Sequence, residues 1–336
     1  MATPSPTPAA VVGATTWGAT LAIILARRGV PVRLLARTDE EARGLDARRE
    51  HARLPGHRFP PTLALTADPR EALAGASVMV VAVPSSHVRA AARGVAGCLG
   101  DDAVVISAAK GIELGTLKRM SEVIAEELPS ARVCALSGPN LAKEVADGLP
   151  STTVIASADS GAAQAAQALL NSGAFRVYTN ADLVGTELGG VLKNIVAIGS
   201  GVVHGLGMGD NARAALVNRG LAEMTRLGVA AGASPLTFAG LAGMGDLIAT
   251  CYSPLSRNHR LGIELGRGKP LDEALAALGG QVAEGVNATR AALDMAARLG
   301  VEMPIAQVTG RVLFEGMSPR EAAAALMSRA PRAEAP

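Results

Sequence analysis

The chain has 336 residues, of which 49% are hydrophobic and 18% charged, so it is long and apolar enough to fold into two globular domains. A formal net charge of +2 and an aromatic content of 2% argue against a nucleic-acid-binding surface, which needs clustered cations and stacking side chains. Cys98, Cys134 and Cys251 lie far apart, and the five histidines are scattered without ligand spacing. We therefore expect free thiols in a reducing cytoplasm, no disulfide framework and no metal site.

Both ends of the chain are predicted to be disordered polar tails. Residues 1–9 alternate Pro, Ser, Thr and Ala and have neither the basic start nor the apolar core of a signal peptide. Residues 329–336 form a second tail. The apolar stretches between the tails are interrupted by Gly, Ser or charge before twenty residues, so we expect no membrane-spanning helix.

The first half, residues 10–182, alternates short apolar runs with helical patterns. The runs predict strands at Ala10–Val12, Val32–Ala36, Val78–Val83, Ala103–Ser107, Val133–Leu136, Thr152–Ala156 and Phe175–Thr179. Helices are predicted at Trp17–Arg28, His87–Leu99, Thr116–Glu127 and Ala162–Leu170. Strands that are apolar throughout and separated by helices indicate a mostly parallel sheet covered on both faces. The prediction is an α/β, Rossmann-like, doubly wound dinucleotide-binding domain.

The second half, residues 183–328, lacks strand signals and is predicted to be an all-helical domain. Its helices are expected at Leu183–Val203, Asn211–Gly228, Pro235–Leu241, Ser256–Gly266, Leu271–Leu278, Val286–Leu299, Pro304–Glu315 and Pro319–Ser328. Two domains of this kind leave a cleft between them, which is the usual place for a ligand. We expect this second domain to supply the substrate and catalytic residues and the chain to form a homodimer.

A glycine-rich turn joins the first strand to the first helix. Gly13-Ala14-Thr15-Thr16-Trp17-Gly18 is similar to the Gly-x-Gly-x-x-Gly fingerprint, in which a helix N-terminus binds a pyrophosphate. Gly13 would make the tight turn and Gly18 would let the helix pack closely on the sheet. Thr15 replaces the middle glycine, and its Cβ would push the phosphate outward. An ordinary βα turn is the alternative interpretation.

Arg37 follows the second strand, where a dinucleotide-binding site places the side chain that contacts the 2′ position of the adenosine ribose. An acidic residue at this position accepts from the 2′-hydroxyl of NAD, whereas an arginine accommodates the 2′-phosphate of NADP. Arg37 therefore favours NADP, although the nearby Asp39 leaves NAD open. A solvated loop arginine is the alternative interpretation.

Lys193 is one of only five lysines and lies in the otherwise almost uncharged stretch Glu187–Val203. Burial disfavours an ammonium and moves the pKa of a lysine toward neutrality, where it exchanges protons readily. A pKa of about 7.5 would correspond to roughly 4 kcal/mol of differential solvation. The alternative is a lysine whose stem packs in the core while its head reaches water.

Six segments, in this order, carry a more specific signal. They are Ala109–Glu113 (AKGIE), Leu136–Glu144 (LSGPNLAKE), Glu187–Asn194 (ELGGVLKN), Ala242–Cys251 (AGMGDLIATC), Ser256–Asn258 (SRN) and Gly280–Gly285 (GQVAEG). Together they resemble the NAD(P)-dependent glycerol-3-phosphate dehydrogenase family of the bacterial type, from about Val11 to Leu326. The resemblance implies an oxidoreductase that interconverts sn-glycerol 3-phosphate and dihydroxyacetone phosphate and supplies glycerol 3-phosphate for phospholipid synthesis.

The resemblance also implies a role for individual residues. Catalytic positions are matched by Lys193, the proton donor and acceptor, with Asp246 and Lys110. Cofactor-contacting positions are matched by Thr16, Trp17, Arg37, Lys110, Ala142, Arg257, Val282 and Glu284, beside Gly13 and Gly18. Substrate-contacting positions are matched by Lys110, Gly138, Asn140, Lys193, Asp246, Ser256, Arg257 and Asn258. The family more often has Ser or Thr where this chain has Asn140.

The chemistry of these residues agrees with that reaction. Reducing a ketone places negative charge on its oxygen, which a positioned ammonium at Lys193 would stabilise and protonate. Asp246 would orient that ammonium, Lys110 would lower its pKa, and the planar fork of Arg257 suits a phosphate. Two alternatives stay open: a two-domain dehydrogenase of another hydroxy acid or sugar acid, and a non-catalytic NADP-binding sensor.

Overall fold

The computed structural model describes residues 8–331 and 333–334. Of the predicted tails, residues 1–7, 332 and 335–336 lie outside the described residues, while Ala9 already belongs to the first strand. The chain divides into two compact units, one up to Glu187 and one from Leu188 onward. The division between the units falls within helix α8 (Leu183–Gly205), after its fifth residue, whereas the sequence predicted a boundary after Asp182.

The described part of the first unit contains one eight-stranded sheet in the order β3-β2-β1-β4-β5-β6-β7-β8. Its strands are β1 (Ala9–Val12), β2 (Val32–Leu35), β3 (Leu63–Thr66), β4 (Val78–Val81), β5 (Val104–Ser107), β6 (Arg132–Ser137), β7 (Ser151–Ala156) and β8 (Phe175–Asn180). Every pair is parallel except β6 with β7. The predicted mostly parallel, doubly wound sheet is confirmed. β3 was not predicted, because this edge strand is short, only half buried and free of β-branched runs.

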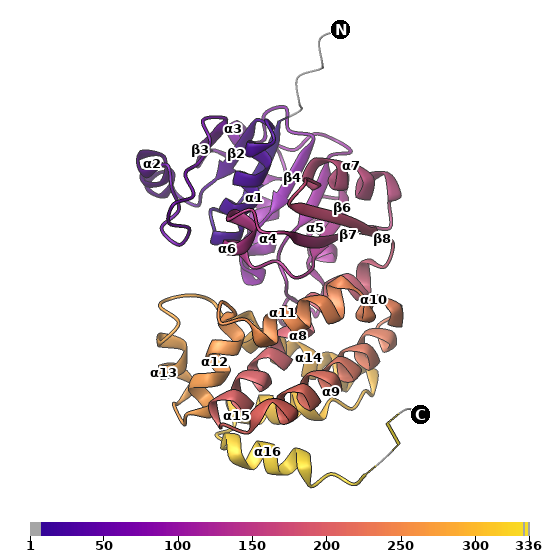
Figure 1. Cartoon of the computed structure of the whole chain (residues 1–336). Coiled ribbons are helices and arrows are strands. Elements are labelled where there is room, and N and C mark those ends of the chain that lie inside the picture. The colour runs from indigo at the N-terminus through magenta and orange to yellow at the C-terminus, as the bar shows by residue number, and fades with distance from the viewer. Residues whose placement is uncertain (1–7, 332, 335–336) are drawn as a thin grey trace. The chain divides into compact units, whose positions relative to one another are not determined.

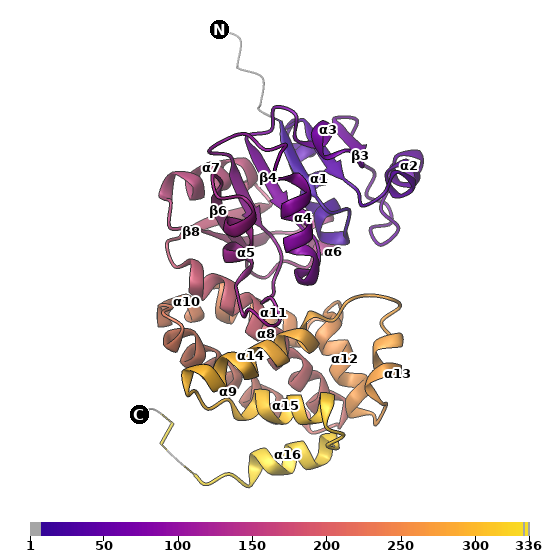
Figure 2. The same ribbon diagram turned by 180° about the vertical axis from the view of Figure 1, so that it is seen from behind.

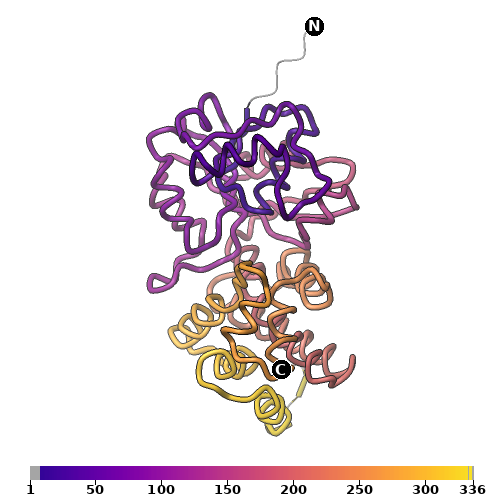
Figure 3. The backbone as a smooth tube through the Cα atoms, turned by 90° about the vertical axis from the view of Figure 1, so that its left-hand side faces the viewer, coloured from indigo at the N-terminus to yellow at the C-terminus, as the bar shows by residue number. Residues whose placement is uncertain are grey.

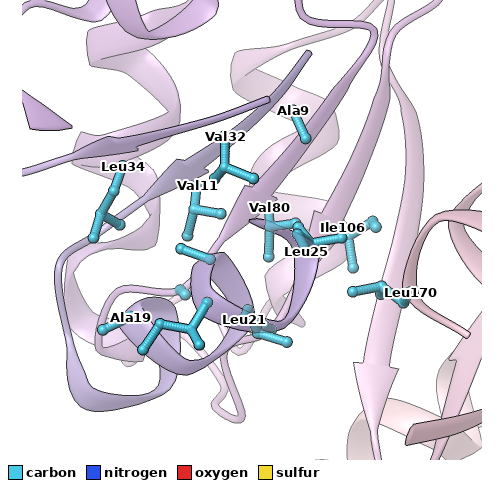
Figure 4. Close-up of a cluster of buried hydrophobic side chains, with 14 of the residues drawn as sticks. Ala9, Val11, Ala19, Leu21, Leu25, Val32, Leu34, Val80, Ile106 and Leu170 are labelled. Atoms are coloured by element: carbon cyan, nitrogen blue, oxygen red, sulfur yellow. The ribbon is translucent and has the colours of Figure 1, made fainter. Parts of the chain in front are cut away.

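Helices cover both faces of this sheet (Figures 1 and 2). One face packs against α1 (Thr16–Arg27), α6 (Ala142–Ala146) and α7 (Ser160–Leu170), the other against α3 (Pro69–Leu73), α4 (Val88–Val95) and α5 (Met120–Glu127), with α2 (Asp39–Arg48) beside β3. Neighbouring residues of β1 point to opposite faces of the sheet. Val11 packs with Leu21 and Leu25 of α1, whereas Val12 joins the cluster of the other face (Figure 4). Burial on both faces explains why the strand is apolar throughout.

Two predicted helices of the first unit are shorter than expected. The helix predicted at His87–Leu99 ends at Val95, where the chain enters a turn. The pattern from Thr116 to Glu127 predicted a continuous helix, but α5 begins only at Met120. Thr116 to Arg119 belong instead to a hairpin, in which Leu117 has a φ of 59° and Arg119 pairs with Ile112. A left-handed residue interrupts a helix, so the apolar spacing across this turn was misleading. The sequence also did not reveal α2, α3 and α6.

The described part of the second unit is helical throughout, as predicted, and Figure 3 shows its winding in the pink through orange to yellow part of the tube. Its elements are α8 (Leu183–Gly205, which begins in the first unit), α9 (Gly209–Ala230), α10 (Pro235–Ala239), a π-helical turn (Leu241–Gly245), α11 (Asp246–Tyr252), α12 (Arg257–Gly266), α13 (Leu271–Ala276), α14 (Glu284–Leu299), α15 (Pro304–Phe314) and α16 (Pro319–Met327). The π turn and α11 were not predicted as helical, since Gly243 and Gly245 before Asp246 pointed to a turn.

Helix α8 is the one described helix long and apolar enough to cross a membrane by length and composition. Within the structure 83% of its apolar window is buried by protein, so it serves as a core helix. Its partner α12 approaches it at backbone distance. A Cβ placed on Gly262 would lie 2.0 Å from the Ile198 carbonyl oxygen, and one on Gly201 would lie 2.1 Å from that of His259. This close approach places the start of α12 beside the middle of α8.

Candidate functional site

Lys193 lies buried on α8 with two hydrogen-bond partners on α11. Its Nζ atom is 2.5 Å from Asp246 Oδ1 and 2.6 Å from Thr250 Oγ1. All three residues are at most 6% exposed. Asp246 and Thr250 stand four residues apart, and therefore on one face of α11. The ammonium is thus held in the protein interior by a carboxylate and a hydroxyl, which excludes the alternative of a lysine whose head reaches bulk water.

Glycines of α8 and of the π turn make this pairing possible. A Cβ on Gly189 would lie 2.5 Å from the Ala242 carbonyl oxygen, and one on Gly243 would lie 2.2 Å from that of Phe238. Only residues without side chains allow backbones to meet at that distance. The contact at Gly189 brings α8 against the π turn, so that Lys193, one helical turn further along, lies opposite Asp246 at the start of α11.

A second polar chain runs from α8 through α12 to the start of α14. Asn258 Nδ2 donates to Asn194 Oδ1 at 2.8 Å, and the backbone nitrogen of Gly285 donates to Asn258 Oδ1 at 3.0 Å. A Cβ on Gly285 would lie 2.8 Å from Asn258 Oδ1, which leaves room only for glycine. The network fixes Asn258 and, through Gly285, the neighbouring Glu284 relative to α8.

The start of α12 presents Arg257 at the surface. Ser256 is the N-cap, and its hydroxyl accepts from the backbone nitrogen of His259 at 3.2 Å. Ser256 and Asn258 are buried, whereas Arg257 between them is exposed. A helix N-terminus with an exposed guanidinium in its first turn suits an anion. Val282, in the segment before α14, is 46% exposed.

In the first unit, the glycine-rich turn has the geometry that the sequence predicted for its two outer glycines. Gly13 has a φ of 108°, and a Cβ on it would lie 2.7 Å from Val83 Cγ1. A Cβ on Gly18 would lie 2.0 Å from the Gly13 carbonyl oxygen. The turn therefore requires glycine at both positions.

Thr15, where the fingerprint has its middle glycine, is the N-cap of α1. Its hydroxyl donates to the Ala82 carbonyl at 2.7 Å and accepts from the backbone nitrogen of Gly18 at 3.0 Å. The side chain is thereby held against β4 and the helix start. Thr16 and Trp17 form the first turn of α1, where a phosphate would meet backbone N–H groups.

Arg37 lies exposed in the loop that follows β2. Its backbone nitrogen donates to Glu41 Oε2 at 2.9 Å, and Thr38 caps α2 by accepting from the Glu41 nitrogen. Asp39, the acidic residue that left NAD open, occupies the first turn of α2. The acidic side chain beside the end of β2 is therefore Glu41, whose carboxylate accepts a hydrogen bond from the backbone nitrogen of Arg37.

Lys110 lies beside the loop that follows β6. Its Nζ atom donates to the Gly138 carbonyl oxygen at 3.0 Å. Gly138 has a φ of 149°, and a Cβ on it would lie 3.0 Å from Thr153 Cα. Asn140 fastens the same loop to β7, because its Nδ2 donates to the Thr152 carbonyl and its Oδ1 accepts from the Thr153 hydroxyl, both at 2.9 Å.

The carboxyl ends of the central strands retain unused polar groups. Among the described residues, the hydroxyls of Ser107 and Ser137, the last residues of β5 and β6, are buried without a hydrogen-bond partner. Ligands of doubly wound sheets bind at this edge. Ala142, the first residue of α6, accepts from the Thr20 hydroxyl of α1 at 3.2 Å, which ties α6 to the helix of the glycine-rich turn. The residues present therefore fit a dinucleotide.

The structure thus joins some predicted residues and leaves others separate. Lys193 meets Asp246 within the second unit, and Lys110 meets Gly138 within the first. A convergence of Lys110 with Lys193 stays a prediction. Sequence reasoning missed Thr250 and Asn194. The spacing of Thr250 from Asp246 on one helix, and the place of Asn194 directly after Lys193, were the signals available.

Two family models match the chain. NAD-dependent glycerol-3-phosphate dehydrogenase N-terminus matches residues 8–163, and NAD-dependent glycerol-3-phosphate dehydrogenase C-terminus matches residues 182–324. The chain belongs to the NAD-dependent glycerol-3-phosphate dehydrogenase family.

Relatives within this glycerol-3-phosphate dehydrogenase family are similar over nearly the full length. A Streptomyces griseus protein named glycerol-3-phosphate dehydrogenase, NAD(P)+, is 47% identical and covers 98% of both chains. A protein of the same name from Dehalococcoides mccartyi is 47% identical over 95% of this chain and 90% of that protein. A crystal structure of glycerol-3-phosphate dehydrogenase from Coxiella burnetii superposes with a TM-score of 0.93 at 37% identity, covering 97% of this chain and all of that one.

Hydroxy-acid enzymes are more distant from this glycerol-3-phosphate dehydrogenase family member. A ketopantoate reductase from Ralstonia eutropha has a TM-score of 0.60 at 17% identity, covering 95% of this chain and 99% of that one. This comparison establishes a common fold and nothing about the substrate.

Proposed function

We propose that the protein interconverts sn-glycerol 3-phosphate and dihydroxyacetone phosphate, with NADP favoured over NAD as the redox partner. The observation that carries the proposal is the buried Lys193 ammonium, held by Asp246 and Thr250 on a single face of α11. A buried lysine with two fixed partners has a set position and orientation, which a proton donor requires. Membership of the glycerol-3-phosphate dehydrogenase family supports the choice of substrate.

Lys193 is the proposed proton donor and acceptor. When bound, the nicotinamide supplies or accepts the hydride. As the ketone of dihydroxyacetone phosphate is reduced, Lys193 stabilises the negative charge on the carbonyl oxygen and delivers a proton to it, later regaining one from solvent. Asp246 stabilises the ammonium before that transfer, and Thr250 fixes its direction. In the reverse direction the neutral amine accepts the hydroxyl proton of glycerol 3-phosphate.

Arg257 is the proposed phosphate ligand. An exposed guanidinium in the first turn of α12 offers two parallel donors, and the helix N-terminus adds a favourable dipole. We assign Ser256 and Asn258 to the substrate pocket beside it. Ser256 keeps the helix start in place, and Asn258 is oriented by Asn194 and Gly285, which supports a fixed anion site.

On the first unit, we assign Lys110 to the substrate and nicotinamide, and Gly138 and Asn140 to the substrate. Lys110 is a compact cation whose stem is fixed by its bond to the Gly138 carbonyl, which suits contact with a phosphorylated ligand. Cofactor contacts are assigned to Gly13, Thr16, Trp17, Gly18, Arg37, Lys110, Ala142, Arg257, Val282 and Glu284. Arg37 is the residue proposed to bind the 2′-phosphate of NADP.

We further propose a homodimer that acts in the cytoplasm and supplies glycerol 3-phosphate for phospholipid synthesis. The direction of flux toward glycerol 3-phosphate agrees with a preference for NADPH, the usual reductant of biosynthesis. Analytical ultracentrifugation tests the dimer independently of activity, since a monomer at all concentrations would contradict it.

The deciding experiment is dihydroxyacetone-phosphate-dependent oxidation of NADPH by the pure protein. Turnover is expected with this substrate and not with a panel of 2-keto acids. Absence of turnover would contradict the enzyme proposal and favour a cofactor-binding sensor, whereas turnover of Lys193→Ala at the wild-type rate would contradict the assigned mechanism. Comparing NADPH with NADH in the wild type and in Arg37→Ala tests the cofactor, because the variant is expected to lose the preference for NADPH.

A further inference from the structure

The chain that follows Lys110 forms a short hairpin before entering α5. Ile112 and Arg119 pair as an isolated antiparallel bridge. The backbone nitrogen of Glu113 donates to the Lys118 carbonyl at 2.9 Å, and Leu117 closes the turn by donating to the Glu113 carbonyl at 2.9 Å. Lys110 therefore stands two residues before a self-contained turn, and its position depends on where that turn is held.

Backbone packing transmits the position of the hairpin to Lys110. A Cβ on Gly111, between Lys110 and the hairpin, would lie 2.1 Å from Ser85 Cβ. Ser85 is buried in the short helix that precedes α4. The contact leaves little free space at Gly111, so a displacement of the hairpin must shift Lys110 or strain this contact.

Arg89, in the first turn of α4, holds the hairpin from outside. Its Nε and Nη2 atoms donate to the two carboxylate oxygens of Glu113 at 2.7 and 2.8 Å, which is a bidentate pair. The same guanidinium donates to Glu127 Oε1 and to Glu126 Oε2 on α5, both at 2.8 Å. Arg89 is thus the point at which the hairpin, α4 and α5 meet.

The Arg89–Glu113 pair differs from an ordinary surface ion pair, because it is bidentate and partly buried. The side chains are 28% and 23% exposed, so both are partly shielded from water. The Arg89 guanidinium lowers the pKa of the Glu113 carboxyl to about 2. The Thr116 hydroxyl donates to Glu113 Oε2 at 2.6 Å, which fixes the orientation of the carboxylate within the hairpin.

We infer that the Arg89–Glu113 pair is a positioning device for Lys110. It acts by holding the hairpin so that the ammonium of Lys110 keeps its place beside the Gly138 carbonyl. The inference rests on the proposed function, in which Lys110 binds the substrate. Arg89 and Glu113 are thus positioning residues for Lys110. The bonds of Arg89 to Glu126 and Glu127 have a different role, since they join α4 to α5.

The chain offers a matched pair of variants. Glu113→Ala removes the hairpin partner of Arg89 and leaves its bonds to α5 intact. Glu127→Ala instead removes bonds of 2.8 Å to Arg89 and 2.9 Å to Arg93, which lie on α4 and not on the hairpin. Glu126 is unsuitable as a control, because it also pairs with Lys118 of the hairpin.

Two measurements on the full chain test the inference. In Glu113→Ala, the KM for dihydroxyacetone phosphate is expected to rise roughly tenfold with kcat little changed, since a loosened Lys110 binds substrate less well. A loss of folded protein would lower kcat and leave KM unchanged. Hydrogen exchange at the Glu113 and Leu117 amides is expected to accelerate. Glu127→Ala should keep KM within about twofold of wild type and leave both amides protected.

Wild-type KM in Glu113→Ala, unchanged protection of its hairpin amides, or an equal effect of Glu127→Ala would each overturn the inference. The exchange measurement requires no turnover. If the wild-type protein fails to oxidise NADPH with dihydroxyacetone phosphate, the proposed function fails, and the exchange result still decides whether Glu113 holds the hairpin. As a further check, Arg89→Met combined with Glu113→Ala should raise KM no more than either change alone.

Discussion

Lys193 Nζ lies 2.5 Å from Asp246 Oδ1, with both side chains buried in the helical unit. Two opposite charges at this distance inside a protein depend on one another, because desolvation makes either one costly alone. The pair is therefore a structural requirement as well as the centre of the proposed chemistry, and its two roles can be measured separately.

Removing Asp246 alone should cost more stability than removing both charges. Asp246→Ala is expected to lower the free energy of unfolding by about 3–5 kcal/mol, because it removes the carboxylate that compensates the buried Lys193 ammonium. The double variant Lys193→Met with Asp246→Ala should recover part of that loss. Urea unfolding measures both. A double variant less stable than Asp246→Ala would show that the charge pair itself is strongly stabilising.

Thr250→Val should affect catalysis more than stability. The change keeps the side-chain shape and removes the hydroxyl that accepts from Lys193 at 2.6 Å. Loss of a hydrogen bond to a charged group costs about 1.5–3 kcal/mol, so kcat/KM is expected to fall roughly 10- to 100-fold. Thr225→Val is the matched control, since its hydroxyl bonds only to the Leu221 carbonyl of its own helix. Equal kinetics in the two variants would remove Thr250 from the mechanism.

The titration of Glu223 should make the folded protein less stable as the pH rises from about 4.5 through 7. This buried residue of α9 accepts from the backbone nitrogens of Ile305 and Ala306 at 2.8 and 3.3 Å, at the start of α15. Burial raises the pKa of the Glu223 carboxyl from 4.5 to about 7. Between these values the folded protein binds a proton that the unfolded chain does not, so stability is complete below pH 4.5 and declines as the pH rises through 7.

The expected loss is up to about 3 kcal/mol of unfolding free energy between roughly pH 5 and pH 8. Other groups titrate in this range, so the measurement is the difference between wild type and Glu223→Gln in urea unfolding at each pH. The glutamine variant carries no charge at this position, and its relative stability should rise with pH. A difference that stays constant with pH would mean that the Glu223 pKa is not raised.

Gly262→Ala should disrupt the contact between α12 and α8. The added methyl group would lie 2.0 Å from the Ile198 carbonyl oxygen, so the helices must separate. Overpacking of this kind costs about 1–3 kcal/mol or more, and the displaced α12 should also weaken substrate binding through Arg257. Gly94→Ala in α4 is the control, since nothing lies within 4 Å of the added atom. There the substitution should be neutral or stabilising by up to about 1 kcal/mol.

Sequence periodicity alone determined most of the architecture. The strand runs predicted a parallel sheet because strands buried on both faces contain no polar positions, and β1 meets that condition with both Val11 and Val12 buried. The same reasoning failed at Thr116–Arg119, where apolar spacing resembled a helix although Leu117 turns the chain into a hairpin. Local patterns report which residues are apolar, and they do not report which way the backbone turns.

The chemistry of Lys193 was visible in the sequence as a charge in an apolar stretch, but its partners depended on packing. Asp246 and Thr250 lie more than fifty residues away, and only the glycine contact between α8 and the π turn brings them to Lys193. The bonds from Asn194 through Asn258 to Gly285 and from Arg89 to Glu113 likewise join separate elements. Residue types and their order determined the family and the candidate residues. Distances of a few ångströms between remote side chains were decided by close packing, which no local stretch of sequence encodes.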